Sequence, residues 1–166
     1  MRADALAGPV PDLHVASAVA NETWEENEMR VRDLMQTDVV TVDADAHLEI
    51  AEGLMRMDRI RHLPVVSKGA LVGIVSQRDL FHAALSTAMA RSPEDEQRWL
   101  ARIPVRAAMT REVLSAHPDA DVKHAVEMML RERVGCLPVV EEGRLVGLLS
   151  ETDCLRHLAA LLGGTP

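Results

Sequence analysis

Two short segments of the sequence combine a hydroxyl group and a carboxylate at the same spacing. They are Ser76-Gln77-Arg78-Asp79 and Ser150-Glu151-Thr152-Asp153, and each follows an apolar run and begins a predicted helix. A serine three residues before an acid is typical of a capping box, which satisfies free amides at a helix start. The same geometry suits a nucleotide, because a helix N-terminus attracts phosphate and a fixed carboxylate accepts hydrogen bonds from ribose. Both interpretations stay open at this point.

Both segments belong to an internal repeat with an offset of 74 residues. Residues 31–85 align on residues 105–159 without gaps, with 19 identities in 55 pairs. The match is strongest from His62 to Asp79 and from Cys136 to Asp153. Because a repeat fixes the architecture of a chain, we expect two copies of one unit that pack against each other, with the function where they meet.

Apolar periodicity and turn residues predict the same order of elements in both copies. In the first copy they predict a strand at 39–42, a helix at 46–58 after an Asp45 cap, a hairpin of strands 63–66 and 71–75, and a helix at 77–90. In the second copy they predict a strand at 113–116, a helix after an Asp119 cap, a hairpin over 137–149, and a helix at 151–162. Each unit is therefore β-α-β-β-α, and the predicted fold class is α+β.

Three segments lie outside the two predicted domains, which span residues 31–90 and 104–162. Residues 1–30 form an N-terminal extension in which 12–30 favour a helix. Residues 91–103 form a linker, with a helix that begins at Ser92-Pro93, since serine caps helices and proline suits their first turn. Residues 163–166 form a short tail.

Composition narrows the possible classes of function. The chain of 166 residues has a net charge of −8 and three aromatic residues, Trp24, Phe81 and Trp99. Both features disfavour nucleic-acid binding, because phosphate backbones attract basic surfaces and unpaired bases stack on aromatic rings. Two cysteines without a CxxC motif suit a reducing compartment. No signal peptide or transmembrane run is recognised, so we expect a cytoplasmic protein without membrane contact.

The repeated motif resembles that of the CBS (cystathionine β-synthase) domain. Each copy has a Val-Arg-x-x-Met turn, then Leu-Pro-Val-Val-x-x-Gly-x-Leu-Val-Gly, then Ser-x-x-Asp, and the resemblance covers about residues 31–162. It implies a tandem pair, the Bateman module, that regulates and is not itself an enzyme. It implies an adenosine-containing ligand such as AMP, ADP, ATP, S-adenosylmethionine or an NAD-type dinucleotide. It also implies a homodimer that acts on an unknown effector protein.

The resemblance further implies two clefts between the copies, each with residues from both. The cleft of Asp79 would be lined by Ser76, Asp79, Leu114, Ser115, Cys136, Leu137, Pro138 and Thr152. The cleft of Asp153 would be lined by Val40, Thr41, His62, Leu63, Pro64, Arg78, Ser150 and Asp153. The aspartates would hold ribose hydroxyls, and the serines would contact phosphate or ribose. Because charged donors bind phosphate more strongly than neutral ones, His62 and Arg78 lead us to expect tighter binding of phosphorylated adenosines in the Asp153 cleft.

Other functions remain as alternatives. The first is a protein-interaction or dimerisation module whose clefts bind no ligand. A nucleic-acid-binding regulator is a lower alternative. An enzyme is disfavoured because the sequence offers no Ser-His-Asp or Cys-His constellation. The histidines show no HxxxH or HExxH spacing, so neither a metal site nor a required cofactor is expected.

Overall fold

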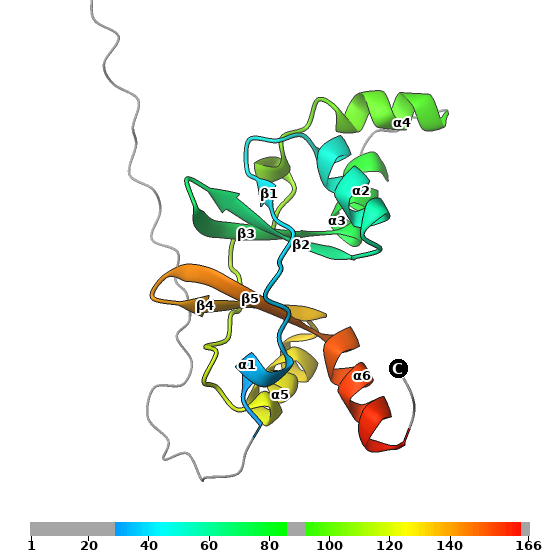
Figure 1. Ribbon diagram of the computed structural model, residues 1–166. Coiled ribbons are helices and arrows are strands. Elements are labelled where there is room, and N and C mark those ends of the chain that lie inside the picture. Colours follow the sequence, from blue (N-terminus) through cyan, green and yellow to red (C-terminus); the bar gives the residue numbers. More distant parts are fainter. Residues whose placement is uncertain (1–28, 86–91, 164–166) are drawn as a thin grey trace, which may run out of the picture.

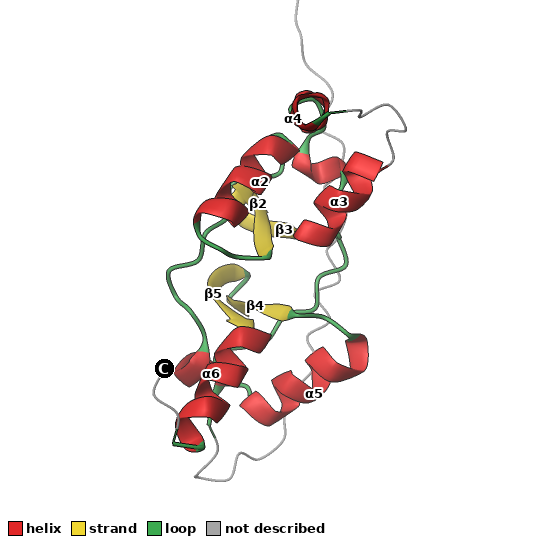
Figure 2. Ribbon diagram, turned by 90° about the vertical axis from the view of Figure 1, so that its right-hand side faces the viewer, coloured by secondary structure: helices red, strands yellow, loops and turns green. Residues whose placement is uncertain are grey.

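Two β-hairpins face each other at the centre of the molecule, and the helices cover their outer sides (Figures 1 and 2). The computed structural model describes residues 29–85 and 92–163. One unit holds a three-stranded sheet in the order β1 (Val42–Asp43), β2 (His62–Ser67) and β3 (Ala70–Ser76), in which β1 is parallel and β3 antiparallel to β2. The other unit holds the antiparallel pair β4 (Cys136–Glu141) and β5 (Arg144–Ser150). This arrangement confirms the predicted α+β fold of two packed repeats.

The helices divide between the two units. The unit of β1–β3 contains α2 (Leu48–Met57), α3 (Gln77–Leu85), α4 (Pro93–Leu100) and the 3₁₀ turn η1 (Val105–Ala107). The unit of β4 and β5 contains α1 (Val31–Leu34), α5 (Val122–Glu132) and α6 (Glu151–Leu161). No helix in residues 29–85 and 92–163 combines the length and apolar character that a membrane crossing needs.

Both hairpins turn as the sequence predicts. The central turn residues have positive φ angles, 50° and 82° at Lys68 and Gly69 and 50° and 77° at Glu142 and Gly143. Positive φ at both central positions defines the type I′ turn, which matches the natural twist of a hairpin. Each hairpin also shifts register once, between Val65 and Val66 and between Val139 and Val140, and beyond that shift Ser76 pairs with His62 and Ser150 with Cys136.

The short first strand of each copy is predicted too long. Strand β1 covers only Val42–Asp43, and the region of 113–116 makes a single parallel bridge, from Ala116 to Val139. The reason is that these segments cross from one unit to the other. Gln36 pairs with Leu148 before the chain reaches β1, and Thr110 pairs with Ile74 before Ala116. Between those anchor points the chain has no neighbouring strand with which to form a ladder.

Two of the predicted helix caps lie two residues too early. Helix α2 follows His47, and the Leu48 amide is satisfied by the Ile103 carbonyl at 2.9 Å instead of by Asp45. Helix α5 follows Asp121, whose carboxylate accepts from the Lys123 amide at 2.7 Å. The predicted Ser92 cap is confirmed, because its Oγ accepts from the Asp95 amide at 3.2 Å. The helix predicted over 12–30 and the end of that predicted over 77–90 lie outside the described residues.

The first turn of each repeat packs in the core of the other unit. Val31 is fully buried in the core of the β4–β5 unit, and its amide donates to Ala120 at 2.8 Å. Val105, its equivalent, is fully buried in the core of the β1–β3 unit, and its amide donates to Ala46 at 2.7 Å. Each unit of packing therefore consists of the strands and helices of one repeat and the first turn of the other. This exchange links the two units through buried side chains and backbone hydrogen bonds.

Candidate ligand-binding clefts

Both Ser-x-x-Asp segments form capping boxes at the starts of α3 and α6. Asp79 Oδ2 accepts from the Ser76 amide at 2.8 Å and from Ser76 Oγ at 2.7 Å, and the Asp79 amide lies 3.3 Å from that hydroxyl. In the second copy the corresponding distances are 2.9, 2.5 and 3.4 Å, between Ser150 and Asp153. The capping interpretation is therefore confirmed for both copies. A ligand role then depends on the carboxylate oxygen that the cap leaves over.

A cavity of about 570 Å³ lies beside Ser76 and Asp79. Its apolar wall includes Ile74 from one unit and Leu114 and Pro138 from the other. Its charged lining carries both signs: Arg61, Arg78, Arg133, Asp79, Glu112 and Glu151. We call this the Asp79 cleft. It can enclose a nucleoside-sized ligand between an aliphatic surface, a cap carboxylate and several arginines.

A second cavity of about 570 Å³ lies beside Ser150 and Asp153. Its apolar lining includes Val39, Val40 and Leu148. Its charged and amide-bearing lining consists of Gln36, Asp38, Asp58, Arg59, Arg61, Asp153 and Arg156. We call this the Asp153 cleft. The two cavities are equal in volume, so size does not distinguish them.

The two clefts share a wall at the centre of the molecule. Arg61, His62, Gly135 and Cys136 line both cavities. His62 and Cys136 occupy equivalent positions of the repeat, 74 residues apart, and both contribute to this shared wall. A β-carbon at Gly135 would lie 3.0 Å from His62 Cε1, so a larger residue there would require the imidazole to move by a few tenths of an ångström.

The shared residues have shifted pKa values. Burial and the nearby Arg61 guanidinium lower the pKa of His62, although Glu151 and Asp79 act in the opposite direction. Burial, with a smaller effect of Glu151, raises the pKa of Cys136 to about 12. Burial and Asp153 also raise the pKa of Cys154. The wall between the clefts therefore presents a neutral imidazole and an unreactive thiol at neutral pH.

The structure brings together five of the eight predicted residues of the Asp79 cleft and four of the eight predicted for the Asp153 cleft. The Asp79 cleft is lined by Ser76, Asp79, Leu114, Cys136 and Pro138, and the Asp153 cleft by Val40, His62, Ser150 and Asp153. Ser115 and Thr41 do not line these cavities. Three more predicted residues are fully buried and do not line the cavities either: Leu63, Pro64 and Leu137. Leu63 belongs to the core of the β1–β3 unit and Leu137 to the core of the β4–β5 unit. The leucines thus support the cleft walls from behind.

Arg78 and Thr152 line the opposite clefts from those expected. Arg78 lines the Asp79 cleft, and Thr152 lines the Asp153 cleft. The physical reason is local: each residue immediately precedes its aspartate in the first turn of α3 or α6. The charge difference that led us to expect tighter phosphate binding at Asp153 is therefore not present as predicted, because Arg78 adds its charge to the Asp79 cleft.

Sequence reasoning missed many of the polar residues that line the clefts, and four of them are informative. Arg59 and Arg133 are equivalent arginines with left-handed φ angles of 55° and 57°, and they line the Asp153 and Asp79 clefts respectively. Their identity at the repeat offset was an available signal. Gln36 and Arg156 line only the Asp153 cleft. They have no identical counterpart in the other repeat, so the repeat alone could not identify them.

A cluster of His117, Asp119 and Glu141 lies on the surface, with potential ligand atoms within 4.8 Å of one another. Asp119 forms an ion pair with the guanidinium of Arg32. The imidazole of His117 accepts a hydrogen bond from the Asp119 amide at 3.2 Å. These contacts engage Asp119 Oδ1 and His117 Nδ1, and exposed groups of this kind commonly lie together without an ion, so we assign no metal to this cluster.

The chain belongs to the CBS domain family, whose model matches residues 31–86 and 105–160. The fold and the paired clefts define it as a CBS-domain pair, which is a regulatory module. It is 31% identical over 159 residues to an uncharacterized 33.4 kDa protein in a ribosomal RNA operon of Thermofilum pendens. That match covers 95% of this chain and 52% of the relative, so the chain spans about half of that protein's length.

Solved structures support the same assignment. A Vibrio cholerae protein named for acetoin utilization (AcuB) superposes with a TM-score of 0.70 at 32% identity, over 82% of this chain and 95% of its own. The CBS-domain pair of protein MJ0100, solved with 5′-methylthioadenosine and S-adenosyl-L-methionine, superposes with a TM-score of 0.68 at 26% identity. That match covers 81% of this chain and 99% of the MJ0100 pair.

Proposed function

We propose that this CBS-domain pair senses an adenosine-containing ligand, which binds in the Asp79 cleft and alters contacts with a partner protein. The observation that carries the proposal is the carboxylate of Asp79. Its Oδ2 is used by the helix cap, whereas its Oδ1 accepts no hydrogen bond from the residues that the structure describes. Asp79 lines a cavity of about 570 Å³, and a carboxylate oxygen with open lone pairs suits a ribose diol.

The remaining lining of the cleft fits the other parts of such a ligand. The aliphatic residues Ile74, Leu114 and Pro138 offer an apolar slot for adenine. The start of α3 and the guanidinium of Arg78 favour a phosphate nearby. Glu112 and Glu151 equally allow a ligand with a positive group, such as a sulfonium. The likeness to a CBS pair solved with two adenosine compounds supports this class of ligand.

The signal would arise because the cleft is built from both units. Ser76 and Asp79 begin α3 of one unit, whereas Leu114, Cys136 and Pro138 belong to the other. A ligand that contacts both sides binds best when the units are closely packed, and it shifts the population toward that arrangement. A partner protein that contacts both units would detect the shift.

The test is a thermal-shift and calorimetric panel of AMP, ADP, ATP, S-adenosylmethionine and NAD on the wild-type protein. A ligand at 100 times its dissociation constant stabilises the fold by about 2.7 kcal/mol. Asp79→Asn should abolish the stabilisation, since it removes the charge but keeps an oxygen for the helix cap. Asp153→Asn is the matched control and should keep it. If none of the five compounds binds the wild type, the proposal is wrong.

A second candidate function, assembly with another copy of the chain, is favoured by the apolar surface of α6. Leu155, Leu158 and Leu161 are 64%, 49% and 70% exposed and recur every three residues, so they lie along neighbouring turns of one side. Phe81, the equivalent of Leu155, is 60% exposed on α3. We propose that these side chains meet those of a second copy. Sedimentation equilibrium should show a dimer that Leu158→Glu dissociates, and a wild-type monomer would contradict this.

A further inference from the structure

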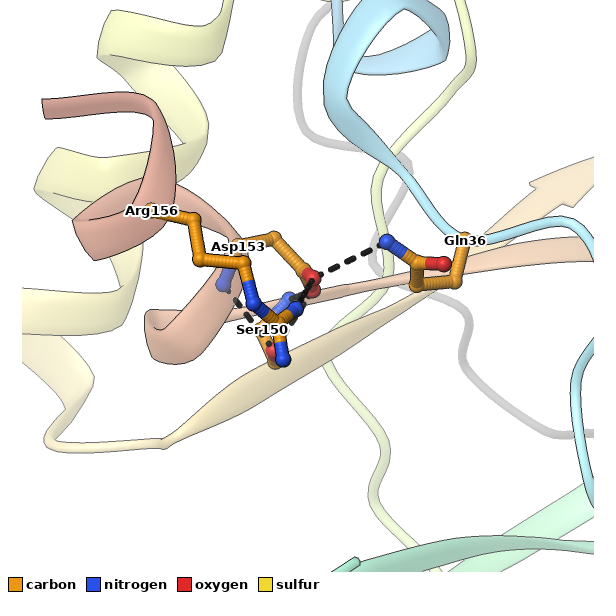
Figure 3. Close-up of polar contacts among 4 residues, drawn as sticks. All are labelled: Gln36, Ser150, Asp153 and Arg156. Carbon is orange, nitrogen blue, oxygen red and sulfur yellow. Dashed lines mark hydrogen bonds and ion pairs between the residues drawn. The ribbon is translucent and has the colours of Figure 1, made fainter. Parts of the chain in front are cut away.

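The two clefts differ in the state of their carboxylates. Asp153 is 5% exposed, and four donors surround its two oxygens. Its Oδ2 accepts from the amide and hydroxyl of Ser150, as in the other cleft. Its Oδ1 accepts from Gln36 Nε2 at 3.1 Å and from Arg156 Nη1 at 3.2 Å (Figure 3). A carboxylate offers about four lone-pair sites, so Asp153 has none left for a ribose hydroxyl.

Gln36 is firmly placed for this contact. Its backbone amide donates to the Leu148 carbonyl at 2.9 Å, and its backbone carbonyl accepts from the Leu148 amide at 2.9 Å. Leu148 lies on β5, two residues before Ser150. The backbone of Gln36 is thus fixed to the strand that leads into the Asp153 cap, and its side chain reaches the carboxylate from the segment between α1 and β1, as Figure 3 shows.

The Asp79 cleft lacks this arrangement because the repeat has changed at both positions. The equivalent of Gln36 is Thr110, which lines the Asp79 cleft but makes no hydrogen bond to Asp79. The equivalent of Arg156 is His82, which does not line that cavity. Thr110 keeps the backbone pairing, with Ile74 in place of Leu148. Only the side chains differ, so the difference is built into the sequence of the two repeats.

We propose that Gln36, with Arg156, holds the Asp153 cleft closed to ribose-containing ligands, so that one adenosine compound binds per chain. The inference deepens the proposed function and rests on it. Gln36 then acts as the specificity-determining residue of the second cleft. A ligand that enters there must displace the side-chain amide of Gln36 from Asp153, and this lowers its affinity. A ligand that enters the Asp79 cleft displaces no protein donor from Asp79 Oδ1.

The test is isothermal titration calorimetry of AMP and of S-adenosylmethionine into the wild type, Gln36→Ala and Gln97→Ala. Gln97 lies exposed on α4, away from the clefts, and its variant is a control for the same chemical change. We expect one site per chain in the wild type and in Gln97→Ala. In Gln36→Ala we expect a second binding site, with an affinity at least tenfold higher than that of any second site in the wild type. The double variant Gln36→Ala/Asp153→Asn should lose this second site. Arg156→Met is a second variant that removes the other donor to Asp153 Oδ1, and we expect it to gain a second binding site as well.

The outcomes separate this inference from the proposed function. Two equal sites in the wild type, a single site that Asp153→Asn removes, or no second site in either opened variant would overturn the closure while leaving nucleotide sensing intact. Absence of binding to the wild type, with binding to Gln36→Ala that Asp153→Asn abolishes, would support closure and overturn the Asp79 assignment. Absence of binding to every variant would overturn both proposals.

Discussion

The sulfur of Met35 lies over Gly147 so closely that a β-carbon on this glycine would come within 2.5 Å of it. The two residues are far apart in the sequence, and Met35 follows the first turn of one repeat while Gly147 lies on β5 of the other. Met109 and Gly73 repeat the contact, at 2.6 Å. Because Gly73 on β3 and Gly147 on β5 have no side chain, the first turn of each repeat can pack on the opposite unit.

The first prediction is that Gly147→Ala and Gly73→Ala destabilise the fold. The added methyl group would meet a methionine sulfur and also a backbone oxygen, Gln36 O at 3.0 Å or Thr110 O at 2.9 Å. Overpacking of this kind costs about 1–3 kcal/mol. Urea unfolding followed by circular dichroism would measure the loss.

Gly53→Ala is the matched control for the first prediction. Gly53 lies inside α2, and nothing is within 4 Å of the position that its β-carbon would take. Alanine in a helix interior is favoured over glycine by about 0.5–1 kcal/mol. We therefore expect stabilisation, and a loss equal to that of Gly147→Ala would contradict the interpretation.

Local features of the fold could be predicted from the sequence. The hairpins depend on turn residues such as Gly69 and on apolar runs that lie next to one another in the chain. The exchange of first turns could not be predicted, because the burial of Val31 and Val105 depends on residues of the opposite unit. The same dependence explains why the strand predicted at 113–116 is reduced to a single bridge, from Ala116 to Val139, after the chain has crossed between the units.

The candidate site was predictable in its repeated part and not in its differences. Ser76, Asp79, Ser150 and Asp153 stand out because both copies keep them. Arg78 was expected in the Asp153 cleft but lines the Asp79 cleft, because α3 holds it beside Asp79. Gln36 was missed because its side chain meets Asp153 only through the pairing of residues 117 positions apart.

The second prediction concerns the start of α5, where sequence and structure differ. Asp121 is 6% exposed and caps the Lys123 amide, so Asp121→Ala should cost about 1–2 kcal/mol. Asp119, the cap expected from the sequence, instead forms an exposed ion pair with Arg32. Surface pairs contribute about 0–1 kcal/mol, so Asp119→Ala should cost less. Urea unfolding of both variants would measure the two losses of stability. A larger loss for Asp119→Ala than for Asp121→Ala would favour Asp119 as the cap.

The third prediction is that Cys136 resists alkylation in the native protein. Its pKa of about 12 reflects burial in the wall between the clefts, and the thiolate is the reactive form. Relative to an ordinary pKa of 9.0, the thiolate fraction at neutral pH falls roughly a thousandfold. Iodoacetamide labelling followed by peptide mass spectrometry should show slow modification. Labelling in guanidinium chloride is the control and should be fast, and equal rates in both conditions would contradict the burial of this thiol.

The fourth prediction is a pH dependence of stability that originates at His62. Burial and Arg61 lower the pKa of the folded imidazole below its usual 6.5, with partial opposition from Glu151 and Asp79. The unfolded chain therefore binds more protons, so the stabilisation is present above the unfolded pKa and is lost as the pH falls from 6.5 through the folded pKa. Urea unfolding at about pH 7.5 and about pH 5.5 would measure this for the wild type and His62→Gln. Carboxylates titrate in both proteins, so the wild type should lose more stability than the variant, and equal losses would show that His62 is not the group responsible.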